Sequence, residues 1–108
     1  MTGNDYQKAA MRTLNKRLTW SEMLADGAMG LAGEAGECAD IVKKYLYQGH
    51  ELDPARLREE LGDLMWYVAV TAAILSIPLD TVMEANVEKL KRRYPEGFSE
   101  EASINRKE

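Results

Sequence analysis

The apolar residues of this chain recur at steps of three and four, and three prolines mark where that pattern is interrupted. Such spacing draws a stripe along one side of a helix, whereas strict alternation would indicate a strand. The sequence contains no convincing strand pattern. Helices are therefore predicted at about 5–17, 19–48, 54–76 and 79–94, with prolines 54, 78 and 95 at their boundaries.

Local signals support these boundaries. Thr19 and Glu22 have the spacing of a capping box, and Gly49 is a stop signal for the long second helix. Asp53 before Pro54 is the expected N-cap of the third helix. Because short connections make consecutive helices antiparallel neighbours, the predicted fold class is all-α, an antiparallel bundle of three to four main helices. We expect so thin a fold to be completed by oligomerisation.

The end of the chain differs in composition from the rest. Residues 1–98 are predicted to form a single helical domain, and residues 99–108 a polar C-terminal tail. The apolar residues of the tail are only Ala102 and Ile104, so the tail is expected to be disordered by itself. An alternative is that it lies across a neighbouring subunit.

Composition excludes several classes of protein. Acidic residues outnumber basic ones by 18 to 14, and this net charge of −4 argues against general nucleic-acid binding. No apolar run approaches the roughly 18 residues of a membrane span. One cysteine, Cys38, and an N-terminus without signal-sequence features fit a reducing cytoplasm. We therefore expect a cytoplasmic protein with neither nucleic acid nor membrane as a partner.

Four carboxylates occupy unusual positions on the predicted helices. The apolar stripe of the second helix contains Leu31, Glu34, Cys38, Ile41 and Tyr45. The stripe of the third helix contains Leu57, Glu60, Leu64 and Val68. Glu37 and Asp63 each follow the stripe glutamate by three residues and neighbour it on the helix surface. Two adjacent helices are thus predicted to aim two pairs of carboxylates at a shared interior.

Such a cluster is costly unless cations neutralise it, because like charges repel and lose hydration together. Hard oxygen ligands at this density suit Mg²⁺, with Mn²⁺ as a substitute. Glu34, Glu37, Glu60 and Asp63 are therefore the candidate metal ligands.

Two structural explanations remain open at this stage. The carboxylates are ordinary surface charges if the helical register is misjudged, or they belong to a buried network of salt bridges with Lys43, Lys44 or Arg58.

Glycine recurs at every third position of the second helix, at 27, 30, 33 and 36. Each glycine costs a helix about 1 kcal/mol relative to alanine, so the repetition needs a reason. Close packing of helices is one explanation, and room for metals and substrate beside Glu34 and Glu37 is another. The two are compatible.

The fourth predicted helix carries a row of polar groups. Asn86 falls within its apolar stripe, where an amide needs partners, and Lys89 and Arg93 follow on the same side. An amide, an ammonium and a guanidinium in a row are able to hold a triphosphate. Cations near a helix end are also common as solvated charges that match the helix dipole, so both interpretations stand.

The order of these motifs resembles a known family. The run GEAGE at 33–37, followed after a spacer by ELGD at 60–63, resembles the ExxE and ExxD signature of MazG-like nucleotide pyrophosphohydrolases, members of the all-α NTP pyrophosphatase superfamily. Further similarity lies in WY at 66–67 and in NxxKLxxRYP at 86–95. The resemblance covers almost the whole chain, and the ordered set is far more specific than either acidic motif alone.

The resemblance implies hydrolysis of a nucleoside triphosphate between its α- and β-phosphates, releasing the monophosphate and pyrophosphate. It implies Mg²⁺ ligands at Glu34, Glu37, Glu60 and Asp63, and Glu37 is our candidate for the base that takes the proton of the attacking water. The implied phosphate contacts are Tyr67, Asn86, Lys89 and Arg93. The resemblance also implies a homodimer or homotetramer, with sites built across subunits.

The base pocket is less specified. Gln7 and Trp20 are candidates for contact with the nucleotide, although aromatic residues at helical spacing are more often part of a core. A dUTP or dCTP specialist and a phosphoribosyl-ATP hydrolase remain alternatives within the enzyme class. Outside it, the alternative is a non-catalytic helical module that binds a nucleotide or a partner protein.

Overall fold

The computed structural model describes residues 1–106, and residues 107–108 at the end of the predicted tail lie outside the described part. The described residues form α1 (Gly3–Met11), α2 (Trp20–Tyr47), α3 (Pro54–Ile74), α4 (Leu79–Arg93) and α5 (Glu100–Ile104). These residues contain no strand, and one isolated bridge joins Pro95 to Gly97. The prediction of an all-α fold is confirmed.

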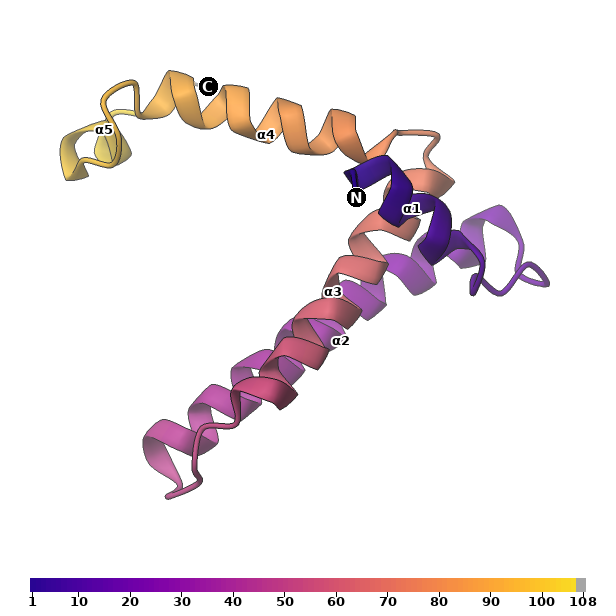
Figure 1. Cartoon of the computed structure of the whole chain (residues 1–108), viewed down its shortest axis with the longest axis horizontal. Helices are drawn as coiled ribbons and strands as arrows, with labels where there is room; N and C mark the ends of the chain where they lie inside the picture. The colour runs from indigo at the N-terminus through magenta and orange to yellow at the C-terminus, as the bar shows by residue number, and fades with distance from the viewer. Residues whose placement is uncertain (107–108) are drawn as a thin grey trace.

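The two longest helices, α2 and α3, run side by side in opposite directions as a hairpin (Figure 1). Thr19 caps α2 through the predicted capping box, in which its hydroxyl accepts from the Glu22 N–H and the Glu22 carboxylate accepts from the Thr19 N–H. Gly49 turns the chain with a φ of 73°, a conformation that glycine adopts without steric cost. Asp53 then caps the first turn of α3. The predicted boundaries of both helices are confirmed to within about two residues.

The small core lies at one end of the hairpin, where α1 crosses α3 and α4 begins. Its buried residues are Ala10, Ala69, Val70 and Leu79, with Tyr6, Met11, Leu14, Trp66 and Ile74 packed against them. The alanines let α1 approach α3 closely, because they add little bulk between the two backbones. We call this region the corner.

The first helix is shorter than the sequence predicts, because α1 ends at Met11 and not near Arg17. Arg12 and Leu14 donate to carbonyls three residues earlier, which tightens the chain into turns. The Asn15 side chain then accepts from the N–H of Arg17. Asparagine stabilises such turns by replacing a helical partner of the backbone, so the helix does not continue.

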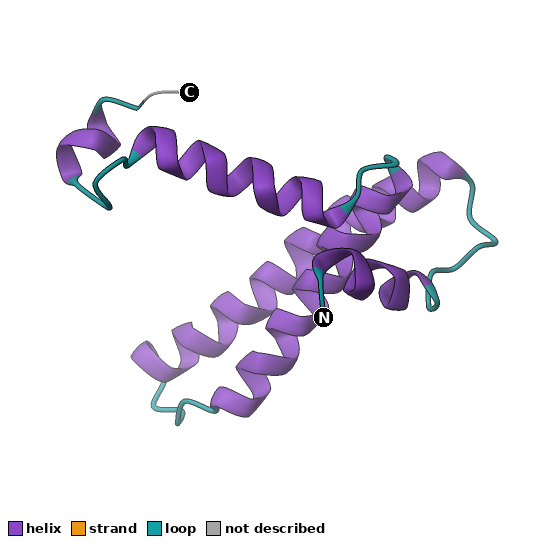
Figure 2. Cartoon of the chain, turned by 45° about the horizontal axis from the view of Figure 1, so that its top comes forward, coloured by secondary structure: helices purple, strands orange, loops and turns teal. Residues whose placement is uncertain are grey.

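The fourth helix leaves the hairpin at 105° to α3 (Figure 2). The short connection alone predicts an antiparallel neighbour, and the structure differs from that expectation. Ser76 adopts a φ of 59°, and the Ile77 N–H returns to the carbonyl of Ala72 at 2.8 Å. This tight reversal, followed by Pro78, sends α4 away from α2 and α3.

Much apolar surface remains exposed along α3 and α4. Six residues line a pocket of about 270 Å³ between these helices, which we call the apolar corner pocket: Met65, Val68, Leu79, Val82, Met83 and Asn86. Within residues 1–106, no single helix is long and apolar enough to cross a membrane, although the bent pair of α3 and α4 meets those criteria when taken together.

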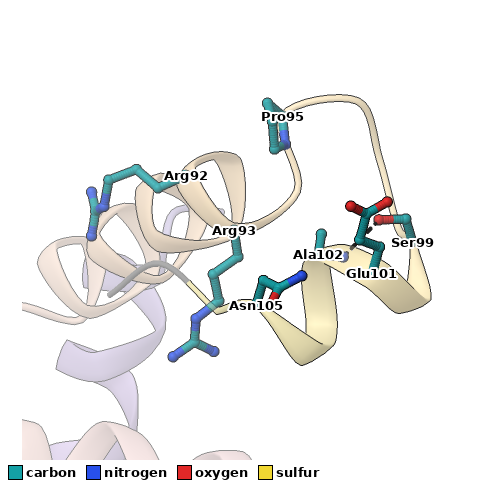
Figure 3. Close-up of a pocket in the computed structure, with 7 residues that line it drawn as sticks. All are labelled: Arg92, Arg93, Pro95, Ser99, Glu101, Ala102 and Asn105. Atoms are coloured by element: carbon teal, nitrogen blue, oxygen red, sulfur yellow. Dashed lines mark hydrogen bonds between the residues drawn. The ribbon is translucent and has the colours of Figure 1, made fainter.

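The tail is not wholly irregular, which corrects the expectation of disorder. Ser99 accepts from the N–H of Ala102 at 3.0 Å and begins α5, a helix of five residues at the far end of α4. With the last turn of α4, this helix lines a pocket of about 250 Å³ that includes Arg93 and Asn105 (Figure 3). The division of the chain at residue 98 stays a prediction.

Candidate metal centre and substrate pocket

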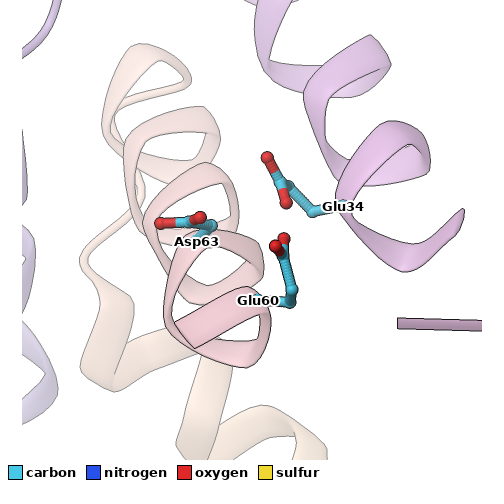
Figure 4. A group of neighbouring side chains, drawn as sticks. All are labelled: Glu34, Glu60 and Asp63. Atoms are coloured by element: carbon cyan, nitrogen blue, oxygen red, sulfur yellow. The ribbon is translucent and has the colours of Figure 1, made fainter. Parts of the chain in front are cut away.

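Three carboxylates from two helices meet on the hairpin. Glu34 comes from α2, and Glu60 and Asp63 come from α3, with one oxygen of each lying within 4.8 Å of the others (Figure 4). Glu34 and Glu60 are half-buried, whereas Asp63 is exposed. We call these three residues the acidic cluster. The predicted convergence of Glu34 with Glu60 is present, at the edge of the interface between the helices.

The acidic cluster is electrostatically strained. A hydrogen bond shared with Glu60, then loss of hydration, and then the charges of Glu60, Asp63 and Glu37 raise the pKa of Glu34 from 4.5 to about 7. The Oε2 atom of Glu34 is also buried and has no hydrogen-bond partner. A buried carboxylate oxygen without a donor is unfavourable, and a divalent cation is the natural partner for it. The donor set therefore fits a hard metal ion.

Nearby lysines take other partners. The ammonium groups of Lys43 and Lys44 lie 3.7 and 2.9 Å from the carboxylate of Asp40. These lysines, which the sequence offered as partners in a buried network, are thus paired on the surface of α2. Among the ion pairs of the described residues, none joins Arg58, the third cation of that alternative, to the acidic cluster. A metal ion is therefore the better explanation for the acidic cluster.

The fourth predicted ligand, Glu37, stands apart. It lies one turn after Glu34 on α2, is exposed, and is not among the carboxylates within 4.8 Å of one another. Its charge still reaches the site, since it helps raise the pKa of Glu34. Its roles as ligand and base stay predictions.

A pocket of about 290 Å³ opens beside the acidic cluster. Its lining residues are Thr13, Glu34, Asp63, Trp66 and Tyr67. The rings of Trp66 and Tyr67 meet edge to face, with centroids 5.0 Å apart. Tyr67, predicted to contact phosphate, is thus placed at the wall of a pocket that shares two carboxylates with the acidic cluster.

Sequence reasoning missed Thr13, which follows α1, lines the pocket and is held there by a hydrogen bond from Trp66. The indole Nε1–H of Trp66 donates to the Ala10 carbonyl at 3.0 Å and to the Thr13 hydroxyl at 2.9 Å. This pair of bonds fixes the end of α1 beside the pocket. The sequence around Thr13 gives no signal of this role, because its partner Trp66 lies 53 residues further along the chain.

The polar row of α4, which comprises Asn86, Lys89 and Arg93, lies away from the acidic cluster in the single chain. Asn86 lines the apolar corner pocket, Arg93 lines the pocket next to α5, and half-buried Lys89 lies between them on the helix. Because α4 leads away from the hairpin, the structure does not bring this row to the acidic cluster within one chain (Figure 1).

Comparison with known proteins identifies the family. The model of the MazG nucleotide pyrophosphohydrolase domain matches residues 27–98, a span that holds the acidic cluster, Tyr67 and the row on α4. The chain belongs to this family. It is also 42% identical over 89 residues to the "Gene 37 protein" of Mycobacterium phage L5, covering 79% of this chain and 78% of that protein. No solved structure matches it significantly. The resemblance inferred from the acidic motifs is confirmed.

The four glycines of α2 divide into two kinds. A Cβ atom at Gly27 would collide with Thr71, and one at Gly30 would collide with the ring of Tyr67. At Gly33 and Gly36 a Cβ would meet nothing within 4 Å. The first pair is therefore explained by close packing of α2 on α3, and the second pair leaves open space beside the glutamate motif.

Two predicted base contacts have other hydrogen bonds in the structure. The Gln7 amide makes three bonds to backbone groups of Ala69, Ile77 and Leu79. The Trp20 indole donates to the Ile74 carbonyl at 3.0 Å. Neither residue is among those lining the pocket beside the acidic cluster. Their contact with a nucleotide stays a prediction.

Proposed function

We propose that this MazG-family chain is a Mg²⁺-dependent nucleoside triphosphate pyrophosphohydrolase that converts a (d)NTP and water into the (d)NMP and diphosphate. The observation that carries the proposal is the acidic cluster, with an unpartnered buried oxygen of Glu34 beside a pocket lined by Tyr67. An enzyme of this kind would remove unwanted nucleotides from the cytoplasmic pool.

Glu34, Glu60 and Asp63 would hold the metal ion, with Glu37 as the fourth ligand. When bound, Mg²⁺, or Mn²⁺ in its place, would neutralise phosphate charge and lower the pKa of a bound water. Because diphosphate leaves readily under such neutralisation, no covalent nucleophile is required. Cys38 is half-buried, which is consistent with a packing role.

The chain's own side chains would do the remaining work. Glu37 is exposed and its carboxylate lies outside the acidic cluster, so we assign it the role of general base toward the attacking water. The Tyr67 hydroxyl would donate to a phosphate oxygen from the pocket wall. Asn86, Lys89 and Arg93 would hold the rest of the triphosphate through charge-assisted hydrogen bonds.

A second copy of the chain would complete this site. The apolar corner pocket is open in the single chain, and Met65, Val82 and Met83 beside it are 54%, 36% and 50% exposed. Exposed apolar area of this kind is typical of an interface. We therefore propose a homodimer or homotetramer in which the polar row of α4 reaches the acidic cluster of another subunit.

The decisive experiment is an assay of the purified protein with Mg²⁺ and a panel of (d)NTPs, including modified ones, with chromatography of the products. We expect the monophosphate and pyrophosphate in equal amounts. Glu37→Gln and Asp63→Asn should each lower kcat/KM by about 100-fold or more, because each removes a group required in the transition state. Exposed Glu59, next to Glu60 but outside the acidic cluster, provides the matched control Glu59→Gln, which should retain activity.

The same panel separates the alternatives. Turnover confined to dUTP or dCTP would indicate a specialist, and turnover of phosphoribosyl-ATP would indicate that hydrolase. Orthophosphate as the first product would contradict the proposed reaction. Absence of turnover with every nucleotide, together with retained nucleotide binding, would favour the non-catalytic module.

A further inference from the structure

The N-terminus of α4 has no cap of its own. Pro78 occupies the N-cap position and provides no side-chain acceptor. The first N–H groups of a helix lack partners within the helix, so they need acceptors from elsewhere. The Leu79 N–H donates to the Oε1 atom of Gln7, and the Asp80 N–H donates to the Oδ1 atom of Asn4, both at 3.0 Å. Helix α1 therefore caps α4 from a distance of more than 70 residues along the chain.

Gln7 and Asn4 make further hydrogen bonds to the residues around the bend. The Nε2 group of Gln7 donates to the carbonyls of Ala69 in α3 and Ile77 in the connection, each at 3.0 Å. The Asn4 N–H donates in return to the Oδ1 atom of Asp80 at 3.2 Å. One amide thus joins the end of α3, the connection and the start of α4, and it uses both of its donor hydrogens and its acceptor to do so.

Helix α4 is also held by the tight connection through Ser76 and by the burial of Leu79 in the corner. Its contacts with α1 are at least as extensive as those with α3, and the bend itself is a short connection through Ser76. Gly3 adds to this contact, because a Cβ atom at that position would collide with Asp80 and Met83. The tight connection turns the chain, and the amides of α1 then hold the first turn of α4 by hydrogen bonds.

We propose that Asn4 and Gln7 are positioning residues that fix the direction of α4 and so determine where its phosphate-binding row is delivered. The proposal rests on the proposed function for the role of Asn86 and Lys89. Gln7 thereby acts on the nucleotide through α4 and not by contact with the base.

A small tilt at the first turn of a helix displaces residues near its far end by a larger distance. Lys89 follows Leu79 by ten residues, which places it about 15 Å further along the axis, at 1.5 Å per residue. A tilt of about 10° at the first turn would move Lys89 by roughly 2–3 Å over that length. A displacement of this size is enough to break a hydrogen bond or ion pair to phosphate, so the cap matters for substrate binding.

The first test measures the direction of α4 without any assay of activity. Spin labels are attached to cysteines at two exposed positions, by Arg58→Cys on α3 and Lys91→Cys on α4, in a full-length Cys38→Ala background. Labelled chains are diluted with unlabelled ones so that distances within one chain dominate. Gln7→Leu should shift or broaden the distance distribution. Asp53→Ala, which removes the N-cap of α3 at the opposite end of the hairpin, should leave it unchanged.

An unchanged distribution in Gln7→Leu would overturn the proposal. Should Gln7→Leu fail to fold by circular dichroism, Asn4→Ala provides the milder variant, because it removes one cap bond and keeps all three bonds of Gln7. A broadened distribution is expected for it too, and a distribution identical to that of the parent chain would count against the proposal.

The second test asks how the nucleotide senses the change. Gln7→Leu should raise KM about tenfold with kcat changed by less than about threefold, as expected when a binding group is displaced. The factor should be the same for every (d)NTP, and Asp53→Ala should match the wild type. A change in the order of base preference would mean that Gln7 reads the base directly, which would overturn the proposal. Absence of wild-type turnover would refute the proposed function alone, since the spin labels still decide the direction of α4.

Discussion

The corner and the hairpin are built on opposite principles. At the corner, Ala69, Val70 and Leu79 are 0%, 1% and 5% exposed, and apolar contact holds three helices together. Along the hairpin from residue 31 to residue 66, only Ile41 is buried, and the interface between α2 and α3 carries the acidic cluster. The comparison indicates that the most completely buried apolar contacts lie at the corner, whereas the hairpin holds like charges close together.

The largest effect is expected for a substitution in the acidic cluster, which should lower activity and raise the stability of the metal-free protein. Glu60→Gln should lower kcat/KM by about 100-fold or more, because it removes a proposed metal ligand. The same substitution should raise the melting temperature of the metal-free protein, since it deletes a like charge beside Glu34. Parallel measurement of turnover and thermal unfolding in EDTA tests this. A lower melting temperature would show that the hairpin depends on Glu60 for its stability.

A cavity in the corner should lower the stability of the protein and leave its metal affinity unchanged. Val70→Ala removes two methyl groups from a fully buried side chain and should cost about 1–3 kcal/mol of unfolding free energy. Urea denaturation gives this value, and isothermal titration with Mg²⁺ should show an affinity close to that of the wild type. Loss of metal affinity in a folded Val70→Ala protein would mean that the two regions are coupled and not separate.

A pair of glycine substitutions sharpens the distinction within α2 itself. Gly36→Ala should stabilise the protein by up to about 1 kcal/mol, because the position is open and alanine is the better helix former. Gly30→Ala should destabilise it, because the new methyl group would collide with the ring of Tyr67. Chemical denaturation of the two variants under identical conditions provides the comparison. Equal changes in both would contradict the described packing.

The smallest effect concerns pH. The pKa of Glu34 is raised from 4.5 to about 7 in the folded protein, so the folded state holds a proton that the unfolded state releases between these values. The metal-free protein should therefore lose stability as the pH rises from about 4.5 to about 7. In EDTA, the melting temperature should be lower at pH 8 than at pH 5, and added Mg²⁺ in place of EDTA should reduce this difference. A melting temperature that rises with pH in EDTA would refute this assignment.

The sequence predicted what local chemistry determines. Thr19, Gly49 and Asp53 mark the ends of α2 and α3 through bonds that reach only a few residues, so these boundaries could be predicted from the sequence. The direction of α4 could not, because the bonds of Gln7 to Leu79 and Asn4 to Asp80 connect residues more than 70 positions apart.

The arrangement of the four acidic residues could also be predicted only in part. A step of three residues moves along a helix by about 4.5 Å, and in antiparallel helices the two steps run in opposite directions. With Glu34 facing Glu60, Glu37 and Asp63 are thus carried about 9 Å apart along the hairpin. The spacing of the motifs predicted that carboxylates meet, but it did not predict which of the four would stand apart.

The bond between Gln7 and Leu79 also has a consequence for synthesis of the chain. Its two ends are separated by 72 residues, whereas α2 and α3 need only a short loop to meet. Contacts between distant residues form late, because closing a long loop costs entropy before any contact compensates for it. On the ribosome, the hairpin is therefore expected to form before α1 makes its contacts, and α1 would be among the last helices to pack.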